Sequence, residues 1–481
     1  MAEAKETAIQ EVNFEEKDAH EIKKAILQEQ IRKSVENYHA PSSPEVQAHL
    51  EWFRDQKFGI MIHWGLYCQM GIKESWPLVD NGWSKWQFKP GTTNKEVKEL
   101  YAQLHKGFLP LRFDPDEWAD AAYAAGFRYL LFTTKHHDGF CMWDTKTTDY
   151  KVTGSEVPWR TNKNADVTRA LFNAFRKRGM GISAYYSRAD FACPHYWEEG
   201  YRWKDGTKRP ASYDPDEKPE TWKAYQDFVY AQLKELVTEY GKIDTLWYDT
   251  GCNGAKLGLP EMTEKLRQYQ PWLIGVIRNG KGVCEDILTP ELVIPEGHID
   301  VPWEACAVMG KPVEEYGDAT HTSFGYTFDQ DYKSAKEVAH LLLDVVAKGG
   351  NLALNLAPQP DGRLPYRALR ELAVLAKWMN IFCTGIYGTR SVAPYRAGKY
   401  AFTRTKDSKT VYAFYLYDES ETAQKTYHIP YTGAAAQVTD LRTGEKLPFA
   451  QTSQGLTVQL PETLAARAGD IADCFVISLY E

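Results

Sequence analysis

The sequence lacks paired cysteines, long apolar runs and an excess of basic residues, and each absence excludes a class of protein. Its 8 cysteines form no CxxC pair, so neither a zinc ribbon nor a disulfide framework is expected. No apolar run reaches the roughly 18 residues of a membrane span, and the start MAEAKETAIQ lacks the features of a signal peptide. With 57 Lys and Arg against 65 Asp and Glu, no basic surface for nucleic acid or an anionic membrane is expected. We therefore expect free thiols, a cytoplasmic location unless a leader has been removed, and neither a nucleic-acid nor a membrane partner.

Aromatic residues, in contrast, are abundant. The 481 residues include 15 Trp and 29 Tyr, and 43% of all residues are hydrophobic, so a large core can be buried. Many of these rings will fill that core. An excess of rings is also typical of sites that stack sugars, whose axial C–H faces are apolar and whose edges are hydroxyls.

The pattern of apolar and polar residues changes twice along the chain, which predicts three parts. Residues 1–45 are charged and predict a helical extension on the surface, with Ile22, Ile26 and Ile31 near helical spacing. Residues 46–390 alternate apolar runs with amphipathic stretches, and the expected strands are 58–64, 128–137, 180–187, 243–249, 272–280 and 351–358. This alternation predicts a parallel α/β sheet, and the length fits a (β/α)8-like barrel. Residues 391–481 contain short alternating runs separated by turn residues, which predict an all-β sandwich.

Polar and aromatic side chains stand at the ends of the expected barrel strands, where (β/α)8 enzymes place their active sites. Asp249 is the most informative, because the run IDTLWYDTG leads from an apolar strand directly into this carboxylate. Trp247 shares its face of the strand and could wall a sugar. The alternative is that Asp249 only caps a turn or a helix.

His136 and His137 follow another expected strand in TTKHHDGFCMWDT, and three interpretations stay open. Adjacent strand residues point to opposite sides, and no HxxxH or CxxC accompanies them, so a metal site is not favoured. A structural role is one alternative. Hydrogen bonding is the interpretation we favour, because a neutral imidazole offers one donor and one acceptor to a polyol. We expect no metal ligand and no cofactor.

Glycoside hydrolysis would need a second carboxylate. The segment between 284 and 304 offers the following acids: Glu285, Asp286, Glu291, Glu296 and Glu304. Arg278, at the end of an expected strand, could contact sugar oxygens and keep a neighbouring carboxylate ionised. The residue pattern alone does not rank these acids.

The motifs, taken together and in order, resemble the α-L-fucosidases of glycoside hydrolase family 29. They are FGIMIHWG (58–65), TTKHHDGFCMWDTKTTDY (133–150), AYYS (184–187), LWYD (246–249), TPE (289–291), WEAC (303–306), SFGY (323–326) and KGGNLALNLAPQPDG (348–362). The match extends from about 58 to 390 and leaves the N-terminal 45 residues outside. The resemblance implies a catalytic (β/α)8-like barrel with a C-terminal β-sandwich. It also implies an exo-acting, retaining α-L-fucosidase that releases terminal L-fucose from fucosylated oligosaccharides or glycoconjugates.

The resemblance also implies roles for individual residues. Asp249 would be the nucleophile, and Glu291 the acid/base, with Asp286 and Glu304 in reserve. The fucose pocket would be formed by the following residues: His63, His136, His137, Tyr185 rather than Tyr186, Trp247, Arg278, and Phe324 beside the C5 methyl group.

One segment departs from the family pattern. Family members commonly have Glu-Trp after the HWG segment, whereas this chain reads KESWP, with Ser75 between Glu74 and Trp76. If Glu74 does not reach the pocket, the preference could shift to a related L-sugar such as an L-galactoside. A catalytically decayed carbohydrate-binding protein and a metal-dependent hydrolase using His63, His136 and His137 are two competing hypotheses. The sequence is also compatible with a homo-oligomer.

Overall fold

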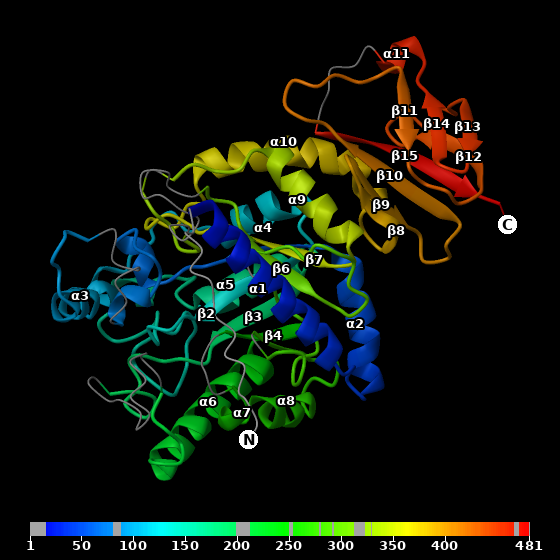
Figure 1. Cartoon of the computed structure of the whole chain (residues 1–481). Helices are drawn as coiled ribbons and strands as arrows, with labels where there is room; N and C mark the ends of the chain where they lie inside the picture. The colour runs from blue at the N-terminus through cyan, green and yellow to red at the C-terminus, as the bar shows by residue number, and fades with distance from the viewer. Residues whose placement is uncertain are drawn as a thin grey trace, which may run out of the picture.

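The protein is described by a computed structural model (Figure 1). It describes residues 16–79, 88–198, 212–249, 254–278, 280–290, 293–311, 323–328, 330–465 and 471–480. Glu291, the favoured acid/base, lies outside these residues. The other residues that the sequence predicts for the site lie within them.

A parallel sheet in the spatial order β5-β4-β3-β2-β1-β7-β6 forms the centre of the described structure. Its strands are β1 (Phe58–Ile62), β2 (Tyr129–Lys135), β3 (Gly181–Ser187), β4 (Thr245–Asp249), β5 (Ile274–Ile277), β6 (Glu304–Val308) and β7 (Asn351–Asn355). All seven are buried along their whole length, as expected when helices cover a sheet curled around its own core. The predicted strands are confirmed: β1 and β2 end directly before His63 and His136, β4 ends at Asp249, and β3 continues one residue past Tyr186.

Residues 286–290 span the gap between the edge strands β5 and β6. The amide of Asp286 donates to the carbonyl of Gly275 in β5 at 2.9 Å. On the other side, the amide of Leu288 donates to Pro302 O at 3.0 Å, and the amide of Glu304 donates to Leu288 O at 2.9 Å. This irregular segment therefore takes the place of an eighth strand, and the (β/α)8-like barrel is confirmed.

Helices cover the outside of the barrel and pack their apolar faces against the strands (Figure 1). They are α2 (Pro44–Gln56), α4 (Pro115–Ala124), α5 (Val167–Arg176), α6 (Pro219–Glu239), α7 (Gly254–Leu257), α8 (Leu259–Arg267), α9 (Ala335–Ala347) and α10 (Tyr366–Phe382). The helix α3 (Asn94–Tyr101) lies apart from the sheet, in the long connection after β1 (Figure 1). The sequence sets their first turns. Ser43 accepts a hydrogen bond from Val46 N at the start of α2, and Ser334 forms a capping box with Glu337 at the start of α9.

The C-terminal part is a sandwich of two antiparallel sheets with orders β12-β15-β10-β9-β8 and β11-β14-β13. Its elements are β8 (Arg390–Ala397), β9 (Tyr400–Arg404), β10 (Thr410–Leu416), β11 (Thr426–Ile429), β12 (Ala435–Asp440), β13 (Phe449–Thr452), β14 (Gly455–Gln459), α11 (Glu462–Ala465) and β15 (Ala472–Leu479). A separate apolar cluster fills the space between the sheets. The other face of the larger sheet packs on the barrel helices, where Phe414 lies 6.3 Å from the ring of Trp378. The predicted β-sandwich is therefore confirmed.

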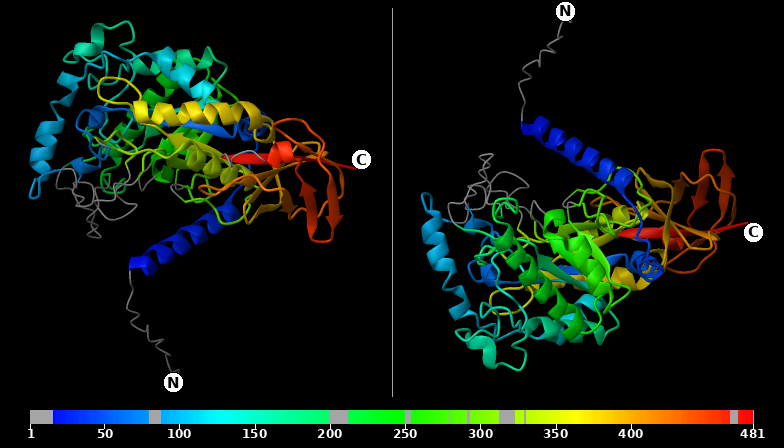
Figure 2. Two further views of the ribbon diagram at one scale, coloured as in Figure 1. Left: turned by 90° about the horizontal axis from the view of Figure 1, so that it is seen from above. Right: turned by 90° about the horizontal axis from the view of Figure 1, so that it is seen from below.

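The N-terminal segment forms the helix α1 (Glu16–Asn37), which lies along one side of the barrel (Figure 2). Ile22 and Ile26 are exposed, as expected for a surface helix, whereas Ile31, Val35 and the following Tyr38 are partly buried against the core. Apolar contacts therefore hold the C-terminal part of α1.

The described cysteines and helices agree with two absences noted in the sequence. Seven cysteines are free thiols, and five of them are buried. Cys252 lies outside the described residues. Within the described part of the chain, no helix combines the length and the apolar character that crossing a membrane requires.

Candidate active site

Asp249 is the last residue of β4, and three side chains surround its carboxylate. Arg278 donates from Nη1 to Oδ1 at 2.7 Å, the hydroxyl of Tyr185 donates to Oδ2, and His137 Nε2 lies 3.7 Å from Oδ2. Burial by itself would raise the pKa of Asp249, but the guanidinium of Arg278 and the hydroxyl of Tyr185 hold it far below its usual range. Asp249 is therefore an ionised carboxylate in a nearly dry site at the carboxyl end of the barrel.

Tyr185 on β3 connects this carboxylate to the aromatic wall of the site. Burial, together with the charge of Asp249, raises the pKa of its phenol well above the ordinary value, so the hydroxyl keeps its proton. The Tyr185 ring stacks on Trp247 of β4 with the ring centres 5.4 Å apart. Tyr186 points away from the site, because its hydroxyl donates to Gln232 on α6 at 2.6 Å. The structure thus brings Tyr185, and not Tyr186, to Asp249.

His63 follows β1 and faces this aromatic wall. Its ring centre lies 5.4 Å from Tyr185, 5.6 Å from His136 and 4.9 Å from Phe324. Asn355 at the end of β7 donates from Nδ2 to Phe324 O at 2.7 Å, so its amide oxygen faces His63 Nδ1 at 2.8 Å. Burial lowers the pKa of His63 to about 4, so the ring is neutral, with its proton on Nδ1. Nε2 remains as an acceptor.

His136 and His137 are each held through Nδ1 by a serine. Ser75 Oγ lies 2.6 Å from His136 Nδ1 and accepts from the amide of Asp138 at 3.1 Å. Ser187 donates to Ala189 O at 2.7 Å and therefore accepts from His137 Nδ1. Burial lowers the pKa of both histidines, that of His137 to about 4. Two neutral imidazoles thus lie beside Asp249.

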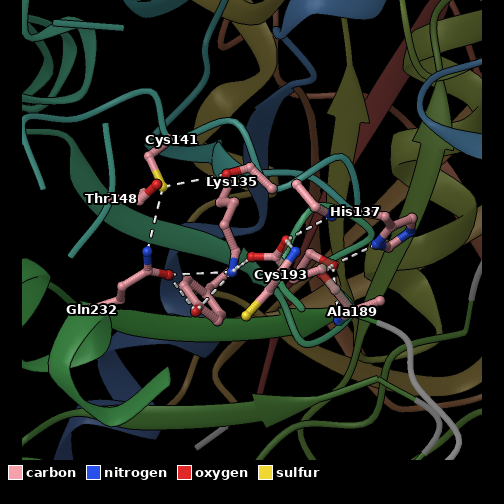
Figure 3. Close-up of polar contacts among 12 residues, drawn as sticks. Lys135, His137, Cys141, Thr148, Ala189, Cys193 and Gln232 are labelled. Carbon is pink, nitrogen blue, oxygen red and sulfur yellow. Dashed lines mark hydrogen bonds and ion pairs between the residues drawn. The ribbon is translucent and has the colours of Figure 1, made fainter. Parts of the chain in front are cut away.

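A buried ion pair supports the strand that carries these histidines (Figure 3). Lys135, the last residue of β2, donates from Nζ to Asp190 at 2.9 Å, to the hydroxyl of Tyr186 at 2.9 Å and to Gln232 at 3.2 Å. Burial would lower the pKa of Lys135, but Asp190 and Tyr186 raise it overall. Lys135 lies on the outer side of β2, so it fixes the strand end from behind while His136 and His137 face the site.

The KESWP segment places Glu74 and Trp76 in different roles. Glu74 is buried, and its Oε1 accepts hydrogen bonds from Ser323 Oγ at 2.8 Å, Gly325 N at 2.8 Å and the amide of Phe324. It therefore holds the turn that positions Phe324. The Trp76 ring packs edge-on against His137, with centres 4.8 Å apart, and is partly exposed, which places it at the rim.

His136, His137 and Asp249 have ligand atoms within 4.8 Å of one another, which is close enough for a metal ion. The guanidinium of Arg278 bonds the same carboxylate at 2.7 Å, and a second cation there would be repelled. The Nδ1 atoms of both histidines are also engaged by serines. This donor set does not favour a metal centre.

The other predicted acids lie away from Asp249. Asp286 pairs with Arg267 at 2.5 Å and accepts from Gly275 N at 2.6 Å, three residues before the level of Asp249 and so about 10 Å from it along the strands. Glu304 begins β6 and accepts from Tyr129 and Trp247 at 2.5 and 3.1 Å, at the amino end of the barrel. Glu285 accepts from the backbone amides of Gly282 and Cys284. The backbone amide of Glu296 donates to Gln28 Oε1 on α1. The structure does not bring either reserve acid to the nucleophile.

The sequence did not predict several residues of the site. Ser75, Ser187 and Asn355 orient the three histidines, and buried Arg188 donates to the carbonyl oxygens of Asp249 and Arg278 at 3.3 and 3.2 Å. Ser187 and Asn355 end strands, which is the signal that could have identified them. Ser75 and Arg188 lie in loops and carry no such signal.

The barrel, the ionised Asp249 at a strand end and the wall of rings and neutral histidines together define a glycoside hydrolase. The sequence matches the alpha-L-fucosidase family over residues 25–384. The chain therefore belongs to the α-L-fucosidases of glycoside hydrolase family 29, and it is an α-L-fucosidase. The matched residues begin at 25, so the resemblance extends further towards the N-terminus than the predicted limit near 58.

Individual relatives cover nearly the whole chain. Tissue alpha-L-fucosidase of Homo sapiens is 26% identical over 443 residues, which are 85% of this chain and 85% of that protein. Alpha-L-fucosidase isoenzyme 1 from Paenibacillus thiaminolyticus superposes with a TM-score of 0.73 at 28% identity, covering 91% of this chain and 100% of the other. The Thermotoga maritima alpha-fucosidase in complex with fucose superposes with a TM-score of 0.71 at 27% identity, and the match covers 90% of this chain and 98% of the other.

Proposed function

We propose that the enzyme is an exo-acting, retaining α-L-fucosidase that removes terminal L-fucose from fucosylated glycans or glycosides. The observation that carries this proposal is Asp249, ionised and aligned by Arg278 and Tyr185 at the end of β4. Its carboxylate attacks the anomeric carbon as the bond to the leaving oxygen breaks, which forms a β-linked fucosyl-enzyme. Water then replaces Asp249 on that carbon and gives α-L-fucose.

We propose Glu291 as the acid/base, which protonates the leaving oxygen and then takes a proton from the attacking water. The position and one contact of its neighbours support this role. Thr289 and Pro290 end the segment that fills the eighth strand position, and Pro290 O accepts from the amide of Cys306, in the middle of β6, at 3.3 Å. Asp286 and Glu304, the reserve acids, are bonded elsewhere.

The pocket side chains receive the sugar in this proposal. His63, His136 and His137 hydrogen-bond the fucose hydroxyls through Nε2, because the Nδ1 atom of each neutral ring is already engaged by Asn355, Ser75 or Ser187. Trp76 and Trp247 contribute apolar faces, and Phe324 contacts the C5 methyl group. An L-galactoside carries a hydroxyl on that carbon, so the ring of Phe324 favours fucose.

Azide tests both carboxylates at once. Glu291→Ala should react slowly on substrates with poor leaving groups, and azide should accelerate an activated fucoside to give α-L-fucosyl azide through the fucosyl-enzyme. Asp249→Gly with azide should give the β-anomer by direct displacement. NMR of the products distinguishes the two, and rescue of an Asp286 or Glu304 variant instead of Glu291 would move the acid/base role.

A further inference from the structure

A cavity of about 160 Å³ lies between α1 and residues 278–299, the segment that leads from β5 to β6. Arg278 lines it, and the same side chain bonds the nucleophile Asp249 at 2.7 Å. Thr289 and Pro290 also line it, and they directly precede Glu291 in the chain. The side chain that holds the nucleophile is therefore part of the cavity wall.

The helix α1 is fixed against this segment by directional contacts. Gln28 donates from Nε2 to Ile294 O at 2.9 Å, and its Oε1 accepts from the amide of Glu296 at 3.1 Å. Tyr38, just after the helix, donates to Asp286 O at 2.9 Å. Gly282 lies so close to α1 that an added Cβ would be 2.0 Å from the carbonyl oxygen of Ser34. The helix α1 thus forms one wall of the cavity and is held against residues 278–299.

The lining combines apolar and polar groups, as the surface of a sugar does. Leu27 and Ile31 of α1 and Leu288 of the facing segment are apolar, whereas Gln30 and Ser34 of α1 offer donors and acceptors. Lys281 and Glu285 add charges of opposite sign, and Asp249 neutralises the charge of Arg278, so the lining favours a neutral ligand. A drug-sized ligand usually occupies at least about 300 Å³, so this volume suits one ring rather than a longer chain.

We propose that this cavity is the subsite for the sugar unit to which fucose is attached, and that α1 forms its outer wall. The inference rests on the proposed function, because only a fucosidase needs an aglycone subsite here. A neutral sugar beyond the leaving oxygen packs its apolar face on Leu27 and Ile31, and its hydroxyls bond Gln30 and Ser34. The N-terminal helix is thereby a specificity element of the enzyme.

Cavity filling tests the subsite without touching the fucose pocket. Gln30→Trp should lower kcat/KM on fucosyl-α-1,2-galactose or a fucosylated N-acetylglucosamine by about tenfold or more, because the ring occupies the subsite. α-L-Fucosyl fluoride has a one-atom leaving group, so its kcat/KM should stay within about twofold. Leu27→Trp, one turn earlier on the same wall, should behave alike. The matched control is Lys33→Trp on the exposed face of α1, which should leave both substrates unchanged.

Two outcomes would overturn the inference. The first is disaccharide hydrolysis that stays within about twofold of wild type in both cavity variants. The second is a parallel loss of rate on disaccharide and fluoride that Lys33→Trp does not share, in which case α1 acts on the catalytic segment and not on the aglycone. Failure of the proposed function is a separate result, since wild-type enzyme would then leave the fluoride itself intact.

Discussion

Two buried carboxyl groups lie at opposite ends of the barrel interior, Asp249 at the carboxyl end and Glu304 at the amino end. Burial raises the pKa of both. At Asp249 the guanidinium of Arg278 more than reverses that effect, whereas the donors to Glu304 are a phenol and an indole, and its pKa stays raised at about 7. The comparison teaches that the partner, and not the depth of burial, decides which carboxyl group is an anion.

The two groups are also joined physically. Trp247 donates to Glu304 through Nε1 at 3.1 Å, and its ring stacks on Tyr185, whose hydroxyl donates to Asp249. Asp249 lies in the active site, whereas Glu304 is part of the packing at the other end of the barrel. Changes at the two ends should therefore separate activity from stability.

The largest effect is expected at Asp249. Asp249→Ala removes the nucleophile and should lower kcat on 4-nitrophenyl α-L-fucoside by about 10⁴-fold or more. Isothermal calorimetry should still detect fucose binding, because the histidines and rings remain. Retention of most of the activity would contradict the assignment of the nucleophile.

Arg278→Gln should have the second largest effect. Without the guanidinium, burial raises the pKa of Asp249, so the acidic limb of the kcat/KM profile moves to higher pH and the rate falls by about 10²-fold or more. In the wild type the depressed pKa of Asp249 also makes the stability of the fold depend on pH. Ionised Asp249 stabilises the fold above its unfolded pKa, and that contribution is lost as the pH falls through its folded pKa.

Arg267→Gln is the matched control, because it removes the partner of Asp286 and leaves Asp249 untouched. It should lower the melting temperature without moving the acidic limb. An unchanged limb in Arg278→Gln would show that Arg278 does not set the charge of the nucleophile.

Glu304→Gln should change stability and spare activity. Unfolded Glu304 loses its proton near 4.5 and the folded residue only near 7, so rising pH between these values destabilises the wild type by about 3 kcal/mol. The amide variant lacks this loss, and its stability relative to wild type should rise over that interval. Denaturant unfolding at pH 4.5, 6 and 8 measures the difference, and parallel stability curves would contradict the raised pKa.

The smallest effects should come from a pair of tyrosine variants. Tyr185→Phe removes the donor to Asp249 and should lower kcat by about tenfold, because a hydrogen bond to a charged group is lost. Tyr129→Phe removes the donor to Glu304 and should lower stability by about 1 kcal/mol with kcat unchanged. Equal effects of both variants on kcat would remove the distinction between the two ends.

The end of each strand was predictable, and the partner of each side chain was not. His63, His136, Tyr185 and Asp249 follow from one rule, since apolar runs identify the strands and active sites lie at their carboxyl ends. Asn355 pairs with His63 across 292 residues of sequence, and Ser75 pairs with His136 across 61. Such distances are set by the closing of the barrel, which no local pattern records.

Two features of the barrel lay beyond sequence patterns for related reasons. Residues 286–290 are too short and irregular to form a predictable strand, and Pro290 has no amide hydrogen to donate. Glu304 was also predicted as a candidate acid, because a run of apolar residues does not show at which end of its strand an acid lies. In the structure it opens β6 instead of ending it.

The docking of α1 against a segment that lies 266 residues later also has a consequence for synthesis. At about 5 to 20 residues per second, the ribosome needs roughly 13 to 53 s to make the distance between Gln28 and Ile294. Most helical stability in proteins comes from tertiary packing, so α1 lacks its main stabilising contacts during that time. The first helix of the described residues is thus among the last elements to reach its place.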